Sequence, residues 1–208
     1  MTKKERVLKI KEILDREYSD AECSLQYEKP YELLIATQLA AQCTDARVNM
    51  VTPALFKRYT SVEAFADADM DELMSYIHST GFFRNKAKNI ISCCKRLVSE
   101  YNGAVPDTME ELLTLDGVGR KTANIILGDV YKKPAMVVDT HAGRLARRMG
   151  LTKNTDPVKV EFDLIKIVPP EYTATFGHQL VWHGRKYCMA RKPNCTDCPL
   201  AEVCPKII

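Results

Sequence analysis

Four cysteines near the end of the sequence have a spacing that suits a metal site. Cys188, Cys195, Cys198 and Cys204 are separated by six, two and five residues. A Cys-x-x-Cys pair places two thiolates on one tight turn, and two outlying cysteines can complete the ligand set of a metal centre. The surrounding sequence has too few large apolar residues to fold by burial alone, so a bound metal would supply the missing stability. Zn²⁺ and an iron–sulfur cluster both accept four cysteines, and the ligands alone leave that choice open.

A second candidate site is the segment LDGVGRKTAN at residues 115–124. Gly117 and Gly119 allow a tight turn with exposed backbone N–H groups, and the N-terminus of the following helix points the same way. Such a turn suits one backbone phosphate. In a helix–hairpin–helix motif, such a turn binds the DNA backbone and makes no contact that depends on the base sequence. The alternative is an ordinary helix–helix turn. The segment lacks the frame of a Walker A phosphate-binding loop.

Lys121 is the candidate nucleophile. It is predicted to lie in the first turn of a helix beside Arg120. The positive end of the helix dipole and the neighbouring guanidinium both disfavour an ammonium group there. A lysine that loses its proton near neutral pH is an amine nucleophile. The alternative is a charged lysine that contacts phosphate.

Asp139 is the candidate carboxylate partner. It lies at the end of the apolar run in AMVVDT, residues 135–140, and His141 follows closely. A carboxylate that emerges from a buried segment suits a nucleophile or a cationic intermediate. It also suits the N-cap of the helix AGRLARRMG, and one aspartate can do both.

The elements that carry these residues are predicted to be helices, because apolar residues recur at helical spacing and no strand alternation of useful length occurs. Thr44 or Asp45 can cap a helix that runs toward Tyr59, and Asp69 with Glu72 resembles a capping box. We expect an all-α chain of about ten helices. They include helices around residues 7–14, 31–41, 85–101, 109–115 and 122–131. The last 25 residues contain three prolines and are not expected to form a long helix.

Composition and charge limit the class of protein. The chain has 208 residues, 46% hydrophobic and 27% charged, which excludes global disorder. No apolar run approaches the ~20 residues of a membrane span. The charged N-terminus lacks the apolar core of a signal peptide. We therefore expect a soluble intracellular protein without a membrane association.

Positive charge is concentrated in two segments. The net charge is only +3, but residues 117–150 carry seven basic and two acidic side chains, and residues 184–208 carry five and two. Such clusters bind polyanions such as nucleic acids, although charge alone also fits ordinary solvated faces.

The chain resembles the endonuclease III family of DNA glycosylases with associated abasic-site lyase activity. The resemblance extends over essentially the whole chain. It rests on the residues LAAQCTD at 39–45, STGFFRNKAKNI at 79–90, LDGVGRKTAN at 115–124, VVDTH at 137–141, and HGRKYC leading into the cysteines at 183–204.

The resemblance implies a site and a cofactor. The four cysteines would bind a [4Fe–4S] cluster, Lys121 would be the catalytic lysine and Asp139 the catalytic aspartate. Gln42 would fill the gap left by an extruded nucleotide, and Phe82 would be an apolar wedge against the opposite strand. The remaining residues expected to contact DNA are Gly117, Val118, Gly119 and Arg120 of the hairpin, His141, and the basic pair Arg191 and Lys192.

The resemblance also implies a two-lobed helix–hairpin–helix fold. A six-helix barrel lobe is expected at residues 23–133, with the helix–hairpin–helix at about 109–131. Residues 1–22 and 134–208 would form the iron–sulfur cluster lobe. Two departures from the family pattern are visible. Asp116 replaces a common proline before the first hairpin glycine, and Phe82 is bulkier than the usual leucine.

The implied function is removal of oxidised pyrimidines from duplex DNA, followed by strand nicking through a lysine Schiff base and β-elimination. The expected partner is double-stranded DNA with damaged pyrimidines or abasic sites. A monomer is expected, in a prokaryotic cytoplasm and associated with the nucleoid through DNA. The alternatives are a related glycosylase with another base preference, a DNA-binding module without catalysis, and an electron-transfer protein.

Overall fold

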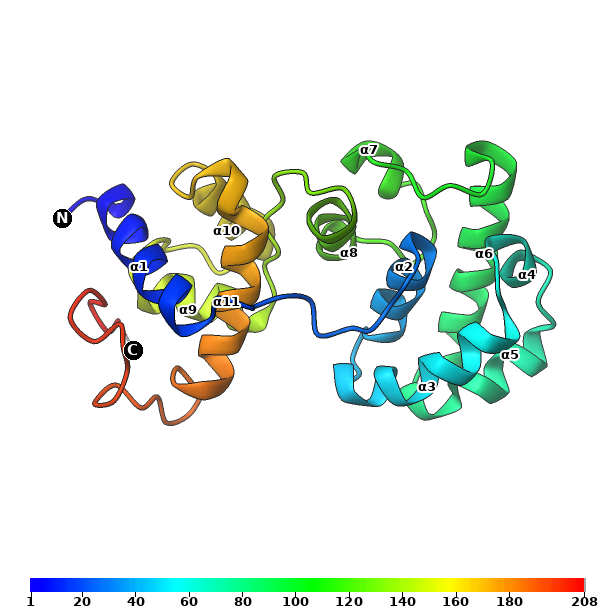
Figure 1. The fold of residues 1–208 in the computed structure, drawn as a ribbon, viewed down its shortest axis with the longest axis horizontal. Helices are drawn as coiled ribbons and strands as arrows, with labels where there is room; N and C mark the ends of the chain where they lie inside the picture. The colour runs from blue at the N-terminus through cyan, green and yellow to red at the C-terminus, as the bar shows by residue number, and fades with distance from the viewer. Residues whose placement is uncertain (208) are drawn as a thin grey trace. The chain divides into compact units, whose positions relative to one another are not determined.

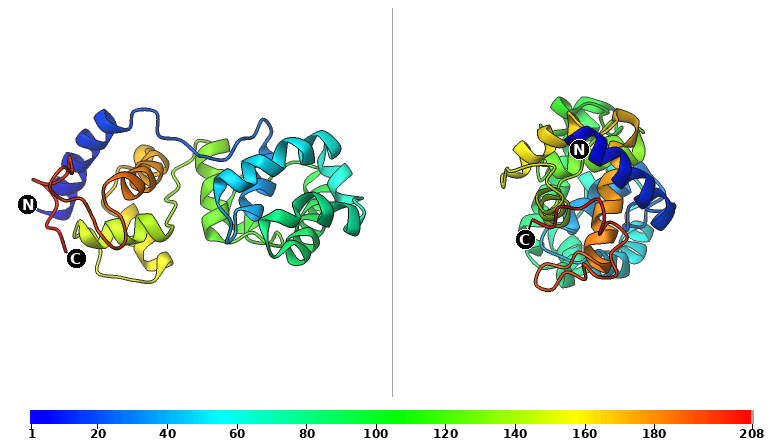
Figure 2. Two further views of the ribbon diagram at one scale, coloured as in Figure 1. Left: turned by 90° about the horizontal axis from the view of Figure 1, so that it is seen from below. Right: turned by 90° about the vertical axis from the view of Figure 1, so that its left-hand side faces the viewer.

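The computed structural model describes residues 1–207, in which helices form two compact units (Figure 1). No β-strand occurs within this range, which confirms the all-α prediction. The unit that we call the hairpin unit is Cys23–Val130, and the one that we call the cluster unit joins Met1–Glu22 to Tyr131–Ile208. The chain therefore leaves the cluster unit after its first helix and returns at Tyr131, a path that Figure 2 shows from two further directions.

The hairpin unit contains seven α-helices, one 3₁₀ turn and one π-helical turn. They are α2 (Pro30–Leu39), α3 (Asp45–Arg58), α4 (Val62–Ala66), α5 (Met70–Ile77), η1 (His78–Thr80), α6 (Phe83–Tyr101), α7 (Met109–Leu112), α8 (Arg120–Ile125) and the π-helical turn η2 (Ile126–Val130).

Helix α2 confirms the helix predicted around residues 31–41, and it is buried from Tyr31 to Leu39. It contacts α3, α6, α8 and η2. Pro30 opens the helix at a position where a backbone N–H is not needed. The Glu32 carboxylate accepts the backbone N–H groups of Glu28 at 2.8 Å and Lys29 at 3.1 Å. These hydrogen bonds satisfy backbone N–H groups at the start of α2, a helix that exposes no face to solvent.

Side-chain caps begin four helices of the hairpin unit. The oxygens of Thr44, Ser61, Asp69 and Thr108 each accept the backbone N–H three residues further on, at the starts of α3, α4, α5 and α7. Such a cap stabilises a helix by about 1 kcal/mol. The cap of α3 is thus Thr44, which decides between the two residues that the sequence offered.

Two helix boundaries differ from the expected ones. Helix α6 begins at Phe83, two residues before the predicted start, because Phe82 adopts a left-handed conformation and serves as its N-cap. Its end at Tyr101 agrees with the predicted range of 85–101, and the two residues that follow, Asn102 and Gly103, both have positive φ. The helix after the hairpin begins at Arg120 and passes into the π-helical turn η2 rather than remaining regular to residue 131.

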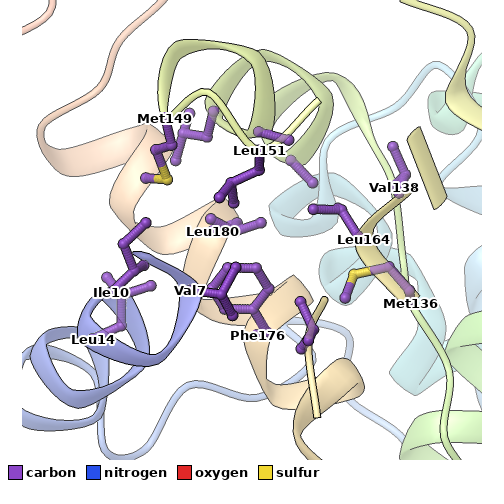
Figure 3. Close-up of a cluster of buried hydrophobic side chains, with 14 of the residues drawn as sticks. Val7, Ile10, Leu14, Met136, Val138, Met149, Leu151, Leu164, Phe176 and Leu180 are labelled. Atoms are coloured by element: carbon purple, nitrogen blue, oxygen red, sulfur yellow. The ribbon is translucent and has the colours of Figure 1, made fainter. Parts of the chain in front are cut away.

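The cluster unit is built from α1 (Lys3–Glu17), α9 (Thr140–Arg148), α10 (Pro157–Ile165), η3 (Pro170–Tyr172) and α11 (Thr173–Lys186). Its apolar core is drawn in Figure 3. Val7, Ile10 and Leu14 of α1 are fully buried in it, as are Phe176 and Leu180 of α11. Burying one such side chain stabilises the fold by ~1.5–3 kcal/mol. This packing attaches the N-terminal helix to elements more than a hundred residues away in sequence.

The part of the chain that follows α11 has no regular helix up to residue 207, as predicted from its prolines. Leu200 is fully buried in the core, and the partly buried Cys188, Cys198 and Cys204 pack against that core. Every helix within residues 1–207 is too short or too polar to cross a lipid bilayer.

Candidate DNA-binding hairpin and cluster site

The turn between α7 and α8 requires glycine at one position. Gly117 has φ +76°, a left-handed conformation. A Cβ atom there would lie 2.8 Å from the side-chain oxygen of Gln38 and 3.0 Å from Cβ of Asn89. Both the dihedral angle and the lack of space therefore exclude a side chain.

Gly119 and Val118 serve the turn in different ways. Gly119 is the N-cap of α8, and open space surrounds the position of a Cβ atom there. Val118 is buried, and its N–H donates to the Leu115 carbonyl at 3.1 Å. The valine side chain anchors the turn in the core while the glycine backbone on either side stays accessible. Accessible backbone N–H groups at a helix start suit a phosphate oxygen.

Helix α6 holds the hairpin in place through two contacts that the sequence did not reveal. The Ser92 hydroxyl donates to the Asp116 carboxylate, and Arg96 Nη1 donates to the Thr114 carbonyl at 2.6 Å. Asp116 is the residue that stands where the family pattern commonly has a proline. The Asp116 carboxylate accepts a hydrogen bond from this hydroxyl of the same unit. The hydrogen bond reduces the repulsion that the carboxylate would exert on a phosphate.

Lys121 is the second residue of α8 and is exposed, while Arg120, the first, is half-buried. The neighbouring thiol of Cys23 does not compete with it as a nucleophile. Burial raises the pKa of the Cys23 thiol to about 12, although Lys121 acts in the opposite direction. This thiol is neutral at physiological pH, and a neutral thiol is a poor nucleophile.

The predicted gap-filling residue and the predicted wedge share an unusual backbone conformation. Gln42 has φ +54° and Phe82 has φ +48°, both left-handed. Gln42 is exposed, and Phe82 exposes 62% of its surface. A left-handed residue other than glycine costs on the order of 1–2 kcal/mol. Strain of this kind is typical of functional sites.

In the cluster unit, Asp139 is the N-cap of α9. Its Oδ1 accepts the Ala142 N–H at 2.8 Å, and the side chain is half-buried. The buried run Ala135–Val138 leads to it and is fixed by the Ala135 N–H, which donates to Thr173 Oγ1 at 2.9 Å. The capping interpretation is thus confirmed, and a catalytic role for the same carboxylate stays a prediction.

His141 follows in the first turn of α9 and is half-buried. Burial lowers its pKa, and the neighbouring Arg144 acts in the same direction while Asp139 opposes it. The neutral ring places Nδ1 3.1 Å from Arg144 Nη2. A Cβ atom at Gly184 would come within 2.7 Å of that nitrogen, so the glycine of the HGRKYC motif is needed where α11 passes α9.

The four cysteines line one cavity of the cluster unit, together with His183, Tyr187 and Arg148. Burial raises the pKa of both Cys198 and Cys204, and neighbouring thiols of the set raise each of them further. No three His, Cys, Asp or Glu side chains within residues 1–207 are grouped so that they could hold a single metal ion. Four thiols around a common cavity are the donor set of a [4Fe–4S] cluster, so these residues fit the group.

Hydrogen-bond donors surround these sulfur atoms. Arg148 Nη1 donates to Cys188 Sγ at 3.4 Å, and the Lys206 backbone N–H donates to Cys204 Sγ at 3.4 Å. His183 Nε2 lies 3.3 Å from Cys198 Sγ. Donors of this kind orient ligand sulfurs and tune a bound cluster.

Two arginines of α9 shape the basic loop that begins after Cys188. Arg144 donates to the Cys188 carbonyl at 2.9 Å, and Arg148 donates to the carbonyls of Met189 and Ala190, each at 2.8 Å. The next residues, Arg191 and Lys192, are exposed. Sequence reasoning missed these two arginines because they contact backbone far away in sequence.

The predicted site residues thus fall into two groups. The hairpin unit brings Gly117 to Lys121 together on one turn and carries Gln42 and Phe82 on two exposed loops. The cluster unit brings the four cysteines together and presents Arg191 and Lys192 beside them, with Asp139 and His141 at the start of α9.

Comparison with protein families gives two matches. Residues 35–170 match the HhH-GPD superfamily of base excision DNA repair proteins, and residues 188–204 match the iron–sulfur binding domain of endonuclease III. The second match confirms that the four cysteines belong to an iron–sulfur domain.

Curated relatives cover nearly the whole chain. Endonuclease III of Synechocystis is 53% identical over 205 residues, which is 98% of this chain and 94% of the relative. Endonuclease III of Bacillus subtilis is 43% identical over 90% of this chain and 86% of the relative. Endonuclease III of Escherichia coli K12 is 38% identical over 86% of this chain and 85% of the relative.

Solved structures of related proteins also match the fold of this chain. A non-covalent endonuclease III–DNA complex and a trapped covalent endonuclease III–DNA intermediate each have a TM-score of 0.93, with 40% identity over 99% of this chain and 97% of theirs. A thermostable thymine-DNA glycosylase has a TM-score of 0.87 at 22% identity, over 98% and 96%, and supports the helix–hairpin–helix glycosylase fold alone.

The Ser92–Asp116 contact predicts a measurable effect on DNA affinity. Ser92→Ala should weaken binding of an abasic duplex by about two- to fivefold, because the freed carboxylate repels phosphate by a few tenths to ~1 kcal/mol. Asp116→Asn in the same background should restore it. The dissociation constants are measured by fluorescence anisotropy at low salt, and equal affinity of the Ser92→Ala and parent proteins would contradict the assignment.

The cysteine set predicts loss of iron on a single substitution. Cys198→Ser should reduce the soluble yield and remove the brown colour, since bound metal supplies stability that this segment lacks. Cys43→Ser, which changes a cysteine of the hairpin unit, is the control. Iron analysis should find about four iron atoms per chain in the parent and control proteins. Full iron in Cys198→Ser would exclude that ligand.

Proposed function

Because this chain belongs to the endonuclease III family and is a base excision repair glycosylase/lyase that binds DNA, we propose that it acts on duplexes containing oxidised pyrimidines or abasic sites. The observation that carries this proposal is the exposed Lys121, one residue past the start of the helix that follows the glycine hairpin. An amine at that place can reach a sugar of the strand whose phosphate the hairpin binds.

The first step is extrusion of the damaged nucleotide. Flipping a nucleotide out of a duplex costs a few kcal/mol and is easiest at a damaged pair. The exposed Gln42 and Phe82 would enter the duplex and hold the vacated space. The hairpin backbone and the basic pair Arg191 and Lys192 would bind phosphates, which positions the duplex without reading its sequence.

The chemical steps follow from an amine nucleophile. The lone pair of the Lys121 amine attacks C1′ of the sugar, the bond from C1′ to the base nitrogen breaks, and the base leaves with the bonding electrons and takes up a proton. The C1′–O4′ bond then breaks, O4′ takes up a proton, and the nitrogen keeps its remaining proton as a protonated Schiff base. Removal of a proton from C2′ then expels the 3′ phosphate by β-elimination and nicks the strand. Water finally hydrolyses the Schiff base and frees the lysine.

Asp139 is assigned help in removing the lysine proton and in stabilising positive charge that develops on the sugar. Its N-cap hydrogen bond uses Oδ1. The iron–sulfur cluster supplies no step of this sequence. Its role is to hold together the segment that carries the basic loop.

The finer proposals on assembly and location rest on the same family membership. We assign a monomer that works on DNA in the cytoplasm. A mass of 23.5 kDa by light scattering for the free chain is the expected result, with one chain per short duplex when DNA is added. A stable dimer of the free protein would contradict it.

The nucleophile is tested by Lys121→Gln. Borohydride reduces a Schiff base to a stable covalent complex, so this variant should give no trapped complex on a thymine glycol duplex while its binding stays measurable. Lys95→Gln, which changes an exposed lysine of α6, is the control and should trap like the parent protein. Undiminished trapping by Lys121→Gln would leave only a DNA-binding role for this lysine.

The basic loop is tested by changing Arg191 and Lys192 together to Ala. Binding should weaken on any duplex sequence, and the slope of log K against log salt should flatten by about 0.9 for each phosphate that the loop no longer neutralises. An unchanged slope would place the loop away from the phosphates.

A further inference from the structure

Lys86 on α6 is buried, with 6% of its surface exposed. It is the only lysine or arginine in the buried class within residues 1–207. Lys88, two residues further along the same helix, is exposed. A buried ammonium group is costly unless its hydrogen bonds are satisfied inside the protein.

Two backbone carbonyls satisfy Lys86. Its Nζ donates to the Leu39 carbonyl at 2.8 Å and to the Thr80 carbonyl at 2.8 Å. Leu39 is the last residue of α2, and Thr80 is the last residue of the 3₁₀ turn η1. The last carbonyls of a helical segment lack partners within it and attract a cation. Burial lowers the pKa of Lys86, and the neighbouring Cys43 opposes that shift.

The two loops that begin at these carbonyls carry the two residues assigned to enter the duplex. Gln42 comes three residues after Leu39, and Phe82 comes two residues after Thr80. Both have left-handed backbone and exposed side chains. A strained conformation persists only where the surrounding structure fixes it. One ammonium group fixes the starting point of both strained loops, and it is supplied by α6 (α2 and α6 are labelled in Figure 1).

We infer that Lys86 is a positioning residue for strand opening, which holds the two loops at a fixed separation so that Gln42 and Phe82 enter the duplex together. The inference rests on the proposed function, because Lys86 is assigned no contact with DNA of its own. Misplacing a positioning element by about 1 Å costs up to ~10²-fold in rate. The effect should therefore appear where a nucleotide must be extruded and disappear where it need not be.

The test compares Lys86→Met, which keeps the length of the side chain but removes the ammonium group, with Lys88→Met, which removes the same charge from the surface of the same helix. The readout of insertion is the fluorescence of 2-aminopurine placed opposite a non-reactive abasic analogue, at saturating protein. Unstacking by an inserted side chain raises this fluorescence. We expect Lys86→Met to reduce the rise about fivefold or more and Lys88→Met to leave it within about twofold.

Catalysis gives a second comparison. Lys86→Met should lower the single-turnover rate on a thymine glycol duplex by about tenfold or more. On a single-stranded abasic substrate, where no pair is opened, the lyase rate should change less than about twofold. Lys86→Arg keeps a cation with several donors and should recover part of the fluorescence rise. Equal losses on both substrates, or no recovery by arginine, would overturn the inference.

A double-mutant cycle separates positioning from general stabilisation. If Lys86 acts through Phe82, Lys86→Met should change the fluorescence rise by less than about twofold in a Phe82→Ala background. Equal fold-changes in both backgrounds would mean that Lys86 only stabilises the fold. If Lys86→Met does not fold, the same cycle is run with Lys86→Arg. Failure of the proposed function is distinguishable, because the parent protein would then neither raise the fluorescence nor nick the abasic strand.

Discussion

The turn at Gly117 is the constraint on which the hairpin depends. Its left-handed backbone and the approach of the Gln38 side chain leave no room for a Cβ atom. The buried Val118 fixes the turn from inside, and α6 fixes it from the side through Ser92 and Arg96. Because these contacts define the backbone of the turn, the helix that follows begins at a defined place. The second residue of that helix is Lys121, which comes directly after the backbone that is proposed to bind phosphate.

The second feature is backbone strain at two exposed residues, which lies next to a buried lysine. Gln42 and Phe82 adopt backbone conformations that cost free energy in isolation. The buried Lys86 donates a hydrogen bond to the last carbonyl of the helical segment before each of them. The hairpin that is proposed to bind phosphate and the two side chains that are proposed to enter the duplex have different tasks, and α6 contacts the segments that carry both.

The cluster unit follows a different physical rule. Its helices fold around an ordinary apolar core, but residues after α11 have little to bury. Their shape is determined by arginines that donate to the backbone around Cys188 and by the sulfur ligands themselves. The same segment presents the exposed Arg191 and Lys192. Stability of the metal site and placement of positive charge are therefore coupled in this unit.

Much of this could be predicted from the sequence, because the relevant signals are local. Helical periodicity and the caps at Thr44 and Asp69 depend on neighbours within a few residues, and the cysteine spacing depends on residues close in sequence. The early start of α6 was missed because it depends on the left-handed Phe82, which no propensity favours.

Contacts between distant segments could not be predicted. A lysine on a helix is normally solvated, so the burial of Lys86 is visible only when the ends of α2 and η1 are brought together. The contact of Asp116 with Ser92 is of the same kind, since it joins the hairpin to the middle of α6. The catalytic pairing of Lys121 with Asp139 stays a prediction from the resemblance.

The central claim is that one particular amine bonds to deoxyribose. The most direct test is to reduce the parent protein with borohydride on a thymine glycol duplex, digest the product with protease and nuclease, and locate the sugar adduct by tandem mass spectrometry. The account predicts a single modified residue, Lys121. An adduct on another lysine or on the N-terminal amine, with Lys121 recovered unmodified, would contradict it.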